Sequence, residues 1–257
     1  MKIAFFSDIH ANLPALQAVL KDIDQQKPDV VYCLGDLVGY NIWPDEVTDE
    51  IRKRHIPTLA GNYDEGIGLH SDDCGCAYKD EVEKANGAVS IAFTNQKVSE
   101  ETRSYLKSLP RHLSMDFSFA DRNIKVLMVH GSPRKINEYL FEDRPEKSLM
   151  RIMSDSDADI LLFGHTHKPF YRKLSYIHEE REAFRHAINI GAVGKPKDGD
   201  PRASYLLMEL DPSLVSTDPD SFRISFRRVE YDVEKAAEAV ENSILPNAYA
   251  KALREGR

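Results

Sequence analysis

The first 60 residues alternate between short apolar runs and amphipathic segments, and this alternation restricts the fold more than any other feature of the chain. Three apolar runs predict strands, at residues 2–7, at residues 28–35 and in the run that ends at Gly61. Apolar residues recur at helical spacing after Asn12, whose side chain can cap a helix, and a second helix is predicted around residues 46–54. Strands that alternate with helices imply a parallel sheet with covering helices.

Residues 66–118 have a different character, because they are polar. Two helical stretches are predicted near residues 79–96 and 100–109, the second with Ser99 as its cap. We interpret this region as a helical excursion across the face of the domain.

Strands are predicted again in the second half of the chain. They lie at residues 124–129, 159–163, 187–191, 203–210 and 222–231, with a helix between the first two and a closing helix at 233–243. A chain of 257 residues with 42% hydrophobic residues can bury a large core. No repeat, low-complexity tract or change of composition marks a linker, so a single domain over residues 1–257 is predicted.

The net charge of −8 argues against generic binding of DNA or RNA, since such binding needs a broad positive field. It does not exclude a small phosphorylated substrate held by metal ions, because the ions dominate the local charge. The sequence leaves the oligomeric state open, including a homo-oligomer.

The cysteine content and the N-terminus predict a cytoplasmic, reduced protein. The chain has three cysteines, Cys33, Cys74 and Cys76, and begins with a strand-like segment and no signal peptide. Cys74 and Cys76 are interpreted as free thiols in a loop, since metal-binding pairs usually show C-x-x-C spacing. No run approaches the ~18 apolar residues of a membrane span.

Polar side chains follow nearly every predicted core strand. They are Asp8, His10, Asp36, Asn62, His130, His165 and His167. In open α/β sheets, sites lie beyond the carboxyl ends of the strands, so these seven side chains are expected to converge on one edge. Each motif alone is weak, but all of them in register with strand ends predict a metal centre.

The ligand types restrict the metal. A mixed set of imidazole, carboxylate and amide donors without cysteine suits Mn²⁺, Fe, Zn²⁺ or Ni²⁺ better than Ca²⁺, and manganese is favoured. Seven ligands are too many for one tetrahedral ion and suit two ions with a bridging carboxylate.

The motifs resemble those of the calcineurin-like metallophosphoesterases, in the order typical of that family. They are Asp8-Ile-His10, Gly35-Asp36-Leu-Val-Gly39, Gly61-Asn62-Tyr63-Asp64, Val129-His130-Gly131 and Gly164-His165-Thr166-His167. The stretch 189–205 is similar to a loop of the small bacterial and archaeal phosphodiesterase branch, from which it departs at Ile190, Ala192 and Lys195. The resemblance implies an α/β fold, an αββα sandwich of two mixed β-sheets flanked by helices.

The resemblance also implies how the ligands are shared between two ions. One ion would be held by Asp8, His10, Asp36 and His167, and the other by Asp36, Asn62, His130 and His165, with Asp36 bridging. A hydroxide between the ions would attack the phosphorus in line.

Tyr63 stands where many family members have a histidine that is assigned to the transition state or to the leaving group. A phenol, with an ordinary pKa of about 10, is a poor general acid at pH 7. Tyr63 could therefore either donate a hydrogen bond or only pack at the rim of the site. Asp64 is expected to support the site through a neighbouring ligand such as His10.

Four further residues are candidate substrate contacts. Arg134 and Asn137 follow His130 closely, and Lys197 and Arg202 lie in the stretch 189–205 together with Lys195. Arg202 could equally form a surface ion pair with Asp200. Four histidines without motif context, His70, His112, His178 and His186, are expected at the surface.

These inferences predict a binuclear metal-dependent phosphoric ester hydrolase, foremost a phosphodiesterase. The alternatives are a hydrolase of nucleoside polyphosphates such as diadenosine tetraphosphate, a protein phosphatase, or a non-catalytic binding module of the same fold. A binding module need not keep the metal ligands, and this chain has all of them.

Overall fold

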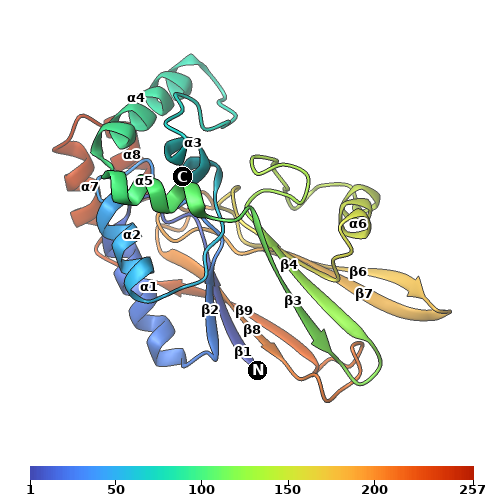
Figure 1. The fold of residues 1–257 in the computed structure, drawn as a ribbon. Helices are drawn as coiled ribbons and strands as arrows, with labels where there is room; N and C mark the ends of the chain where they lie inside the picture. The colour runs from blue at the N-terminus through green and yellow to red at the C-terminus, as the bar shows by residue number, and fades with distance from the viewer.

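Nine strands form two mixed sheets in the computed structural model, which describes residues 1–257 (Figure 1). The first sheet has the order β2-β1-β8-β9. Its strands are β1 (Lys2–Phe6), β2 (Val30–Cys33), β8 (Ala203–Leu210) and β9 (Phe222–Val229). β1 pairs in parallel with β2 and antiparallel with β8, so N-terminal and C-terminal segments share one sheet.

The second sheet has the order β3-β4-β5-β7-β6. Its strands are β3 (His112–Ser118), β4 (Asn123–Val129), β5 (Ile160–Phe163), β6 (Phe170–His178) and β7 (Arg181–Asn189). β5 pairs in parallel with β4 and β7. The edge strand β3 pairs antiparallel with β4, and the edge strand β6 pairs antiparallel with β7.

Helices flank the two sheets on their outer sides. On the side of the first sheet are α1 (Leu13–Gln26), α2 (Pro44–Lys53), α3 (Asn62–Gly68), α4 (Glu81–Lys97), α5 (Glu100–Ser108), α7 (Val233–Glu241) and α8 (Asn247–Glu255). On the side of the second sheet is α6 (Glu146–Asp155). The predicted αββα sandwich is confirmed.

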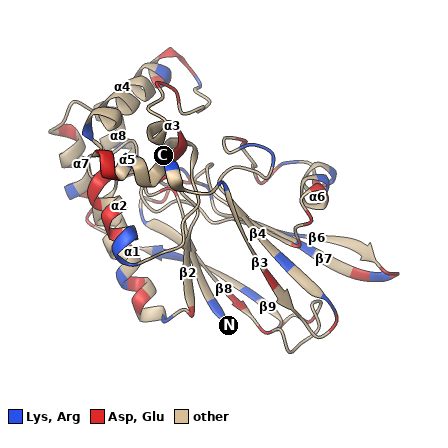
Figure 2. Ribbon diagram, in the orientation of Figure 1, with Lys and Arg blue, Asp and Glu red and all other residues tan.

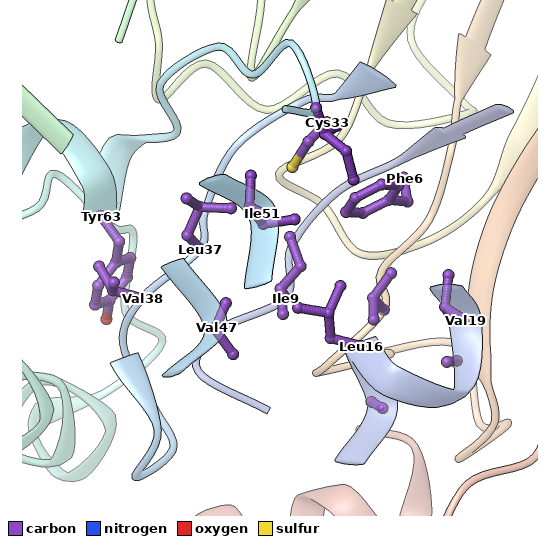
Figure 3. Close-up of a cluster of buried hydrophobic side chains, with 14 of the residues drawn as sticks. Phe6, Ile9, Leu16, Val19, Cys33, Leu37, Val38, Val47, Ile51 and Tyr63 are labelled. Atoms are coloured by element: carbon purple, nitrogen blue, oxygen red, sulfur yellow. The ribbon is translucent and has the colours of Figure 1, made fainter. Parts of the chain in front are cut away.

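The alternation of side chains along β1 shows how the layers are built. Ile3 and Phe5 belong to the core cluster between the sheets, while Ala4 and Phe6 belong to the cluster under the helices. Figure 3 shows Phe6 beside Leu16 and Val19 of α1. A third cluster buries the outer face of the second sheet under α6. All of β1 is therefore held in place, and so is the loop that follows it.

The predicted start of α1 is confirmed. The Asn12 side-chain oxygen accepts a hydrogen bond from the Ala15 backbone N–H at 3.2 Å, and the buried face of the helix includes Leu16, Val19 and Ile23. Such a cap stabilises a helix by about 1 kcal/mol. Ser99 caps α5 in the same way, through the N–H of Thr102.

Two local predictions were wrong. The run that ends at Gly61 is not a full strand: only Thr58 bridges to Cys33, and the Ala60 N–H turns away to the carbonyl of Pro110. Residues 112–118, expected within the helical excursion, form the edge strand β3. Their alternation of half-buried Leu113, Met115 and Phe117 with exposed residues is the strand period.

Charges of both signs are distributed over the helices and both sheets (Figure 2). None of the helices combines the length and apolar character that a membrane span requires.

One of the four histidines expected at the surface, His186, is buried, because its ring packs against Tyr171 and Phe222.

Candidate metal centre

The seven predicted ligands meet at one edge of the sandwich, and none is more than 3% exposed. Asp8 and His10 follow β1, Asp36 follows β2, and Asn62 opens α3. His130 follows β4, and His165 and His167 follow β5. The structure thus brings all seven side chains together, although they come from four strand ends and a helix N-terminus.

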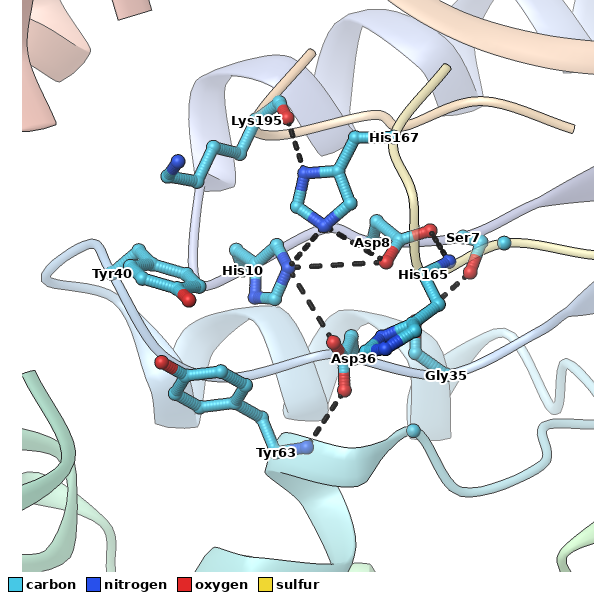
Figure 4. A network of polar contacts seen from close by, with 12 residues as sticks. Ser7, Asp8, His10, Gly35, Asp36, Tyr40, Tyr63, His165, His167 and Lys195 are labelled. Carbon is cyan, nitrogen blue, oxygen red and sulfur yellow. Dashed lines mark hydrogen bonds and ion pairs between the residues drawn. The ribbon is translucent and has the colours of Figure 1, made fainter. Parts of the chain in front are cut away.

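One group consists of Asp8, His10 and His167, whose candidate ligand atoms lie within 4.8 Å of one another. Asp8 Oδ1 lies 3.2 Å from His167 Nε2 and 3.9 Å from His10 Nε2. Figure 4 shows these three side chains pointing toward one another.

The other group consists of Asp36, His130 and His165, with candidate ligand atoms within the same 4.8 Å. His130 Nε2 lies 3.2 Å from Asp36 Oδ2 and 3.1 Å from Asn62 Oδ1. The same Asp36 oxygen lies 3.5 Å from His10 Nε2 of the first group. Asp36 therefore stands between the two groups.

Backbone carbonyls determine the tautomer of three histidines. The Nδ1 atoms of His10, His130 and His167 lie 3.0, 2.9 and 2.5 Å from the carbonyl oxygens of Val38, Leu34 and Lys195. A carbonyl only accepts, so each Nδ1 carries the proton and donates. Each Nε2 is then the nitrogen left to face the centre of the site, as in metal-binding histidines.

The donors fit divalent metal ions. Asp8 Oδ1 and His165 Nε2 are buried and have no hydrogen-bond partner in the protein. Buried polar atoms without a partner are costly, and here they lie among further carboxylates and imidazoles. Cations at the two groups would satisfy all of them, and the mixed N/O donor set suits transition metals.

Comparison with known proteins agrees with this geometry. The family model of the calcineurin-like phosphoesterase superfamily domain matches residues 1–213. The chain belongs to the calcineurin-like phosphoesterase superfamily. It is therefore a metal-dependent phosphoester hydrolase. The sequence motifs had already indicated this family.

Relatives of similar length match nearly the whole chain. An uncharacterised protein of Methanocaldococcus jannaschii, MJ0912, is 34% identical over 99% of this chain and 98% of its own length. A crystal structure of a metallophosphoesterase from Sphaerobacter thermophilus is 30% identical, covers 100% of this chain and 99% of its own, and superposes with a TM-score of 0.74. The hypothetical protein PH1004 from Pyrococcus horikoshii has the same fold, with a TM-score of 0.77, 23% identity, and coverage of 100% of this chain and 98% of its own.

The backbone of this phosphoesterase is strained at the ligands. Five of the seven adopt a left-handed conformation that is unfavourable for residues with a Cβ, with φ of 55° at Asp8, 48° at His10, 54° at Asp36, 66° at His165 and 59° at His167. Each such residue costs on the order of 1–3 kcal/mol. Backbone hydrogen bonds between the loops hold the conformation: the Asp8 N–H donates to Gly35 O, and the His10 N–H to Asp36 O, both at 2.9 Å.

Two glycines of the motifs allow the backbone to approach a ligand closely. A Cβ at Gly61 would lie 2.1 Å from Asp36 Oδ1, and a Cβ at Gly164 would lie 2.4 Å from Asp8 Oδ2. Any side chain at either position would displace a carboxylate of the candidate metal centre.

Burial and neighbouring charges oppose each other in the pKa values of the ligands. Burial alone would raise the pKa of Asp36, but the facing imidazoles, His130 foremost, lower it below its usual value. Burial would lower the pKa of His130, but Asp36 raises it to about 10. Burial, with the charge of His130 in addition, lowers the pKa of His165 to about 4. The carboxylate of Asp36 is thus favoured in its anionic form before any metal binds.

Tyr63 contributes to the site through its backbone. Its N–H donates to Asp36 Oδ1 at 2.9 Å, while its ring lies 4.8 Å from the ring of Tyr40. Figure 4 shows the hydroxyl pointing toward Tyr40 and away from Asp36. The hydroxyl is buried without a hydrogen-bond partner, and burial raises the pKa of Tyr63 well above its usual value.

Asp64 supports the site differently from the expectation that it acts through His10. Its Oδ1 accepts from the Leu37 N–H at 2.8 Å, and its Oδ2 accepts from the Gly61 N–H at 2.9 Å. It therefore joins the loops that carry Asp36 and Asn62, while His10 is held by Val38 instead. Burial, with the charge of Asp36 in addition, raises the pKa of Asp64 to about 7.

A cleft of about 740 Å³ opens onto the metal centre. Lys197 lines it, and so does Lys195. Arg134, Asn137 and Arg202, expected as substrate contacts, do not. Arg134 pairs with Glu138, the Asn137 amide donates to Gly75 O, and Arg202 pairs with Asp200 outside the cleft.

Sequence reasoning missed the aromatic walls of this cleft. They comprise Tyr40, Tyr78, Tyr139, Phe141 and Tyr249. Tyr249 belongs to α8, which was not predicted. No motif marks these residues, because their positions depend on how distant loops and the C-terminal helix pack around the cleft.

Proposed function

We propose that this hydrolase is a phosphodiesterase that acts on small phosphorylated substrates with two divalent ions, manganese favoured. The observation that carries the proposal is the position of Asp36, whose Oδ2 lies 3.5 Å from His10 Nε2 and 3.2 Å from His130 Nε2. A carboxylate between two ligand groups suits a bridge between two ions.

Two bound ions would supply a nucleophilic hydroxide near neutral pH and would neutralise charge on the phosphoryl oxygens. The residues of the chain do the rest. The carbonyls of Val38, Leu34 and Lys195 hold the three imidazoles in the ligating tautomer. The N–H of Tyr63 orients the carboxylate of Asp36.

The shape of the cleft favours a small organic diester over a protein substrate. Five of the candidate ligands line it, and its volume is within the range of roughly 300–1,000 Å³ that is common for small-molecule sites. Its tyrosine and phenylalanine side chains offer apolar surface to the organic groups of an ester.

A second candidate is the hydrolysis of nucleoside polyphosphates, as predicted from the sequence. Lys195 and Lys197 favour it, because they add positive charge beside the metal centre. Tyr63 is compatible with it as well, since its hydroxyl points away from Asp36 and a phosphate can leave without a proton donor.

We also propose a cytoplasmic location. All three cysteines are free thiols, and two of them are buried. A reducing compartment keeps thiols in that form.

The test is an activity panel on the purified protein. Bis(p-nitrophenyl) phosphate, p-nitrophenyl phosphate, phosphoserine and ATP are compared with Mn²⁺, Mg²⁺, Co²⁺, Ni²⁺ and Zn²⁺, and Asp36→Asn serves as the control for contaminating enzymes. We expect the highest kcat/KM for the diester or the anhydride, with Mn²⁺. A preference of more than ~10-fold for the monoesters would overturn the proposal.

A further inference from the structure

Lys195 is buried without a counter-ion. The residue is only 8% exposed, and its Nζ forms no ion pair with a carboxylate. Nζ instead faces two aromatic rings, at 4.8 Å from the centroid of Tyr40 and 5.9 Å from that of Tyr249. Aromatic faces offset only part of the cost of burying an ammonium group.

The segment that carries this lysine is attached to the metal centre. The carbonyl of Lys195 accepts from His167 Nδ1 at 2.5 Å, and the N–H of Lys197 donates to His167 O at 3.2 Å. Just before them, the Gly194 N–H donates to Asp8 O at 2.9 Å. The backbone therefore serves the metal ligands, while both lysine side chains line the cleft.

The Lys195 side chain extends toward Tyr40. Figure 4 shows the ammonium group beside Tyr40, on the side of His10 that is remote from Asp36. The ring of Tyr40 lies 4.8 Å from the ring of His10 in an edge-to-face arrangement. The Lys195 nitrogen is thus close to the metal centre but does not point at the ligands.

The cleft is positive in a chain with a net charge of −8. Four of its lysines form no ion pair: Lys168, Lys195, Lys197 and Lys251. The acidic residues of the cleft outside the metal centre, Glu83 and Glu255, are each paired with another cation, Lys79 and Arg257. The Tyr63 hydroxyl, buried and without a partner, is a further donor at the cleft. Together these groups offer hydrogen-bond donors to an anion.

We propose that Lys195 and Lys197 form a second anion subsite, which binds a phosphoryl group other than the one that is hydrolysed. The inference rests on the second candidate of the proposed function and specifies how its substrate is bound: an organic polyphosphate, such as a nucleoside polyphosphate. Water adds to one phosphorus, the bond from that phosphorus to the bridging oxygen breaks, and the neighbouring phosphate leaves as an anion while the proton from water is released to solvent. Such a leaving group needs no acid, which agrees with the orientation of Tyr63.

A side chain with a purely structural role and a residue of an anion subsite respond differently to the same substitution. Replacing a buried, unpaired charge by an apolar residue of similar length is neutral or stabilising, so Lys195→Met is expected to keep or raise the melting temperature. A subsite residue loses ligand binding in the same variant. Stability and binding therefore separate the two roles.

The experiment compares wild type with Lys195→Met, Lys195→Gln and Lys197→Met, with Lys21→Met on the exposed face of α1 as the matched control. The main readout is the ratio of kcat/KM for ATP to kcat/KM for bis(p-nitrophenyl) phosphate in Mn²⁺. The second is the binding of inorganic pyrophosphate and orthophosphate to the manganese-loaded protein, measured by calorimetry.

We expect the ATP-to-diester ratio to fall by about 10-fold or more in the Lys195 variants and by less than about 2-fold in Lys21→Met, because a charge-assisted contact is lost only in the former. Pyrophosphate affinity should fall by a similar factor, and orthophosphate affinity by much less. A proportional loss on both substrates, with unchanged pyrophosphate affinity, would show that Lys195 is structural and would overturn the inference. If wild type hydrolyses no phosphodiester, the proposed function fails, and pyrophosphate calorimetry alone then decides the subsite.

Discussion

His10 Nε2 and His167 Nε2 face each other at 3.1 Å, and neither nitrogen carries a proton. Both rings donate Nδ1–H to a backbone carbonyl, so both Nε2 atoms present lone pairs. Asp8 Oδ1, which accepts no hydrogen bond, lies 3.2 Å from His167 Nε2. Three electron-rich atoms at this spacing repel one another in the absence of a cation. The protein is therefore built for a metal-loaded state.

Metal binding should stabilise the protein, with two ions per chain at saturation. Each ion at 100 times its dissociation constant adds about 2.7 kcal/mol, and chelation should lower the melting temperature by several degrees. Elemental analysis after Mn²⁺ loading and thermal melts with and without a chelator measure both effects. One ion per chain at saturation, or an unchanged melting temperature, would contradict the two-group arrangement.

Asp36→Asn should lower kcat/KM by at least ~100-fold, because the substitution removes the shared charge while it keeps the shape. The amide oxygen can still accept from the Tyr63 N–H, so the fold should persist. Steady-state kinetics at saturating Mn²⁺ give the answer, with Asp24→Asn on the exposed side of α1 as the control. Turnover close to that of wild type would remove Asp36 from the bridging role.

Tyr63→Phe should change the turnover of aryl diesters by less than about 10-fold, because a neutral hydrogen bond contributes only ~1 kcal/mol. It should not lower the melting temperature either, since the hydroxyl has no partner to lose. Tyr63→His should raise the turnover of alkyl phosphates by roughly 10-fold or more if the imidazole reaches the leaving oxygen.

A leaving-group series on wild type and both Tyr63 variants checks this prediction. Without a proton donor, the rate depends steeply on the basicity of the leaving group. A shallow dependence in wild type that steepens in Tyr63→Phe would identify the phenol as the general acid.

His186 should make the stability of the protein sensitive to acid. It is buried, its Nδ1 lies 2.8 Å from the Tyr171 hydroxyl, and burial, with Lys173 and Arg122 in addition, lowers its pKa to about 3. The folded state therefore keeps His186 neutral, while the unfolded chain binds a proton below a pH of about 6.5. The part of the folding stability that depends on a neutral His186 is fully present above pH ~6.5 and is lost progressively as the pH falls toward ~3.

The His186→Gln variant should lose less stability than wild type between pH 7 and pH 5, by about 1–2 kcal/mol. Urea unfolding at both pH values measures the difference, and His112→Gln on the exposed edge strand is the matched control. Identical losses in wild type and in His186→Gln would refute the assignment.

The ligand set could be predicted from the sequence because each ligand directly follows, or is tied to, a core strand. The carboxyl ends of neighbouring parallel strands meet at one edge of a sheet, so Asp8 and Asp36 had to lie close together once β1 and β2 paired. The same holds for His130 and His165 after β4 and β5. Chain order and strand period were sufficient for this part of the site.

The substrate side of the site could not be predicted in this way. Arg134, Asn137 and Arg202 stand near ligands in the sequence, but local partners hold them outside the cleft. Lys195 and Tyr249, more than 50 residues apart, lie together because α8 returns to the first sheet's side of the molecule. Sequence proximity does not reveal where a long polar side chain finds its partner.

The sequence by itself therefore determined the family, through motifs at strand ends, and with it the αββα architecture that the resemblance implies. It also determined the seven candidate ligands, since these follow the predicted strands. Only the tertiary structure decided the left-handed backbone at five candidate ligands, the hydrogen bonds that orient three histidines and the position of the Lys195 side chain between two aromatic rings. Each of these depends on contacts between loops distant in the sequence, such as the His167 ring with the Lys195 carbonyl. The strained backbone and the buried polar side chains persist because the packed structure around the loops holds them in place.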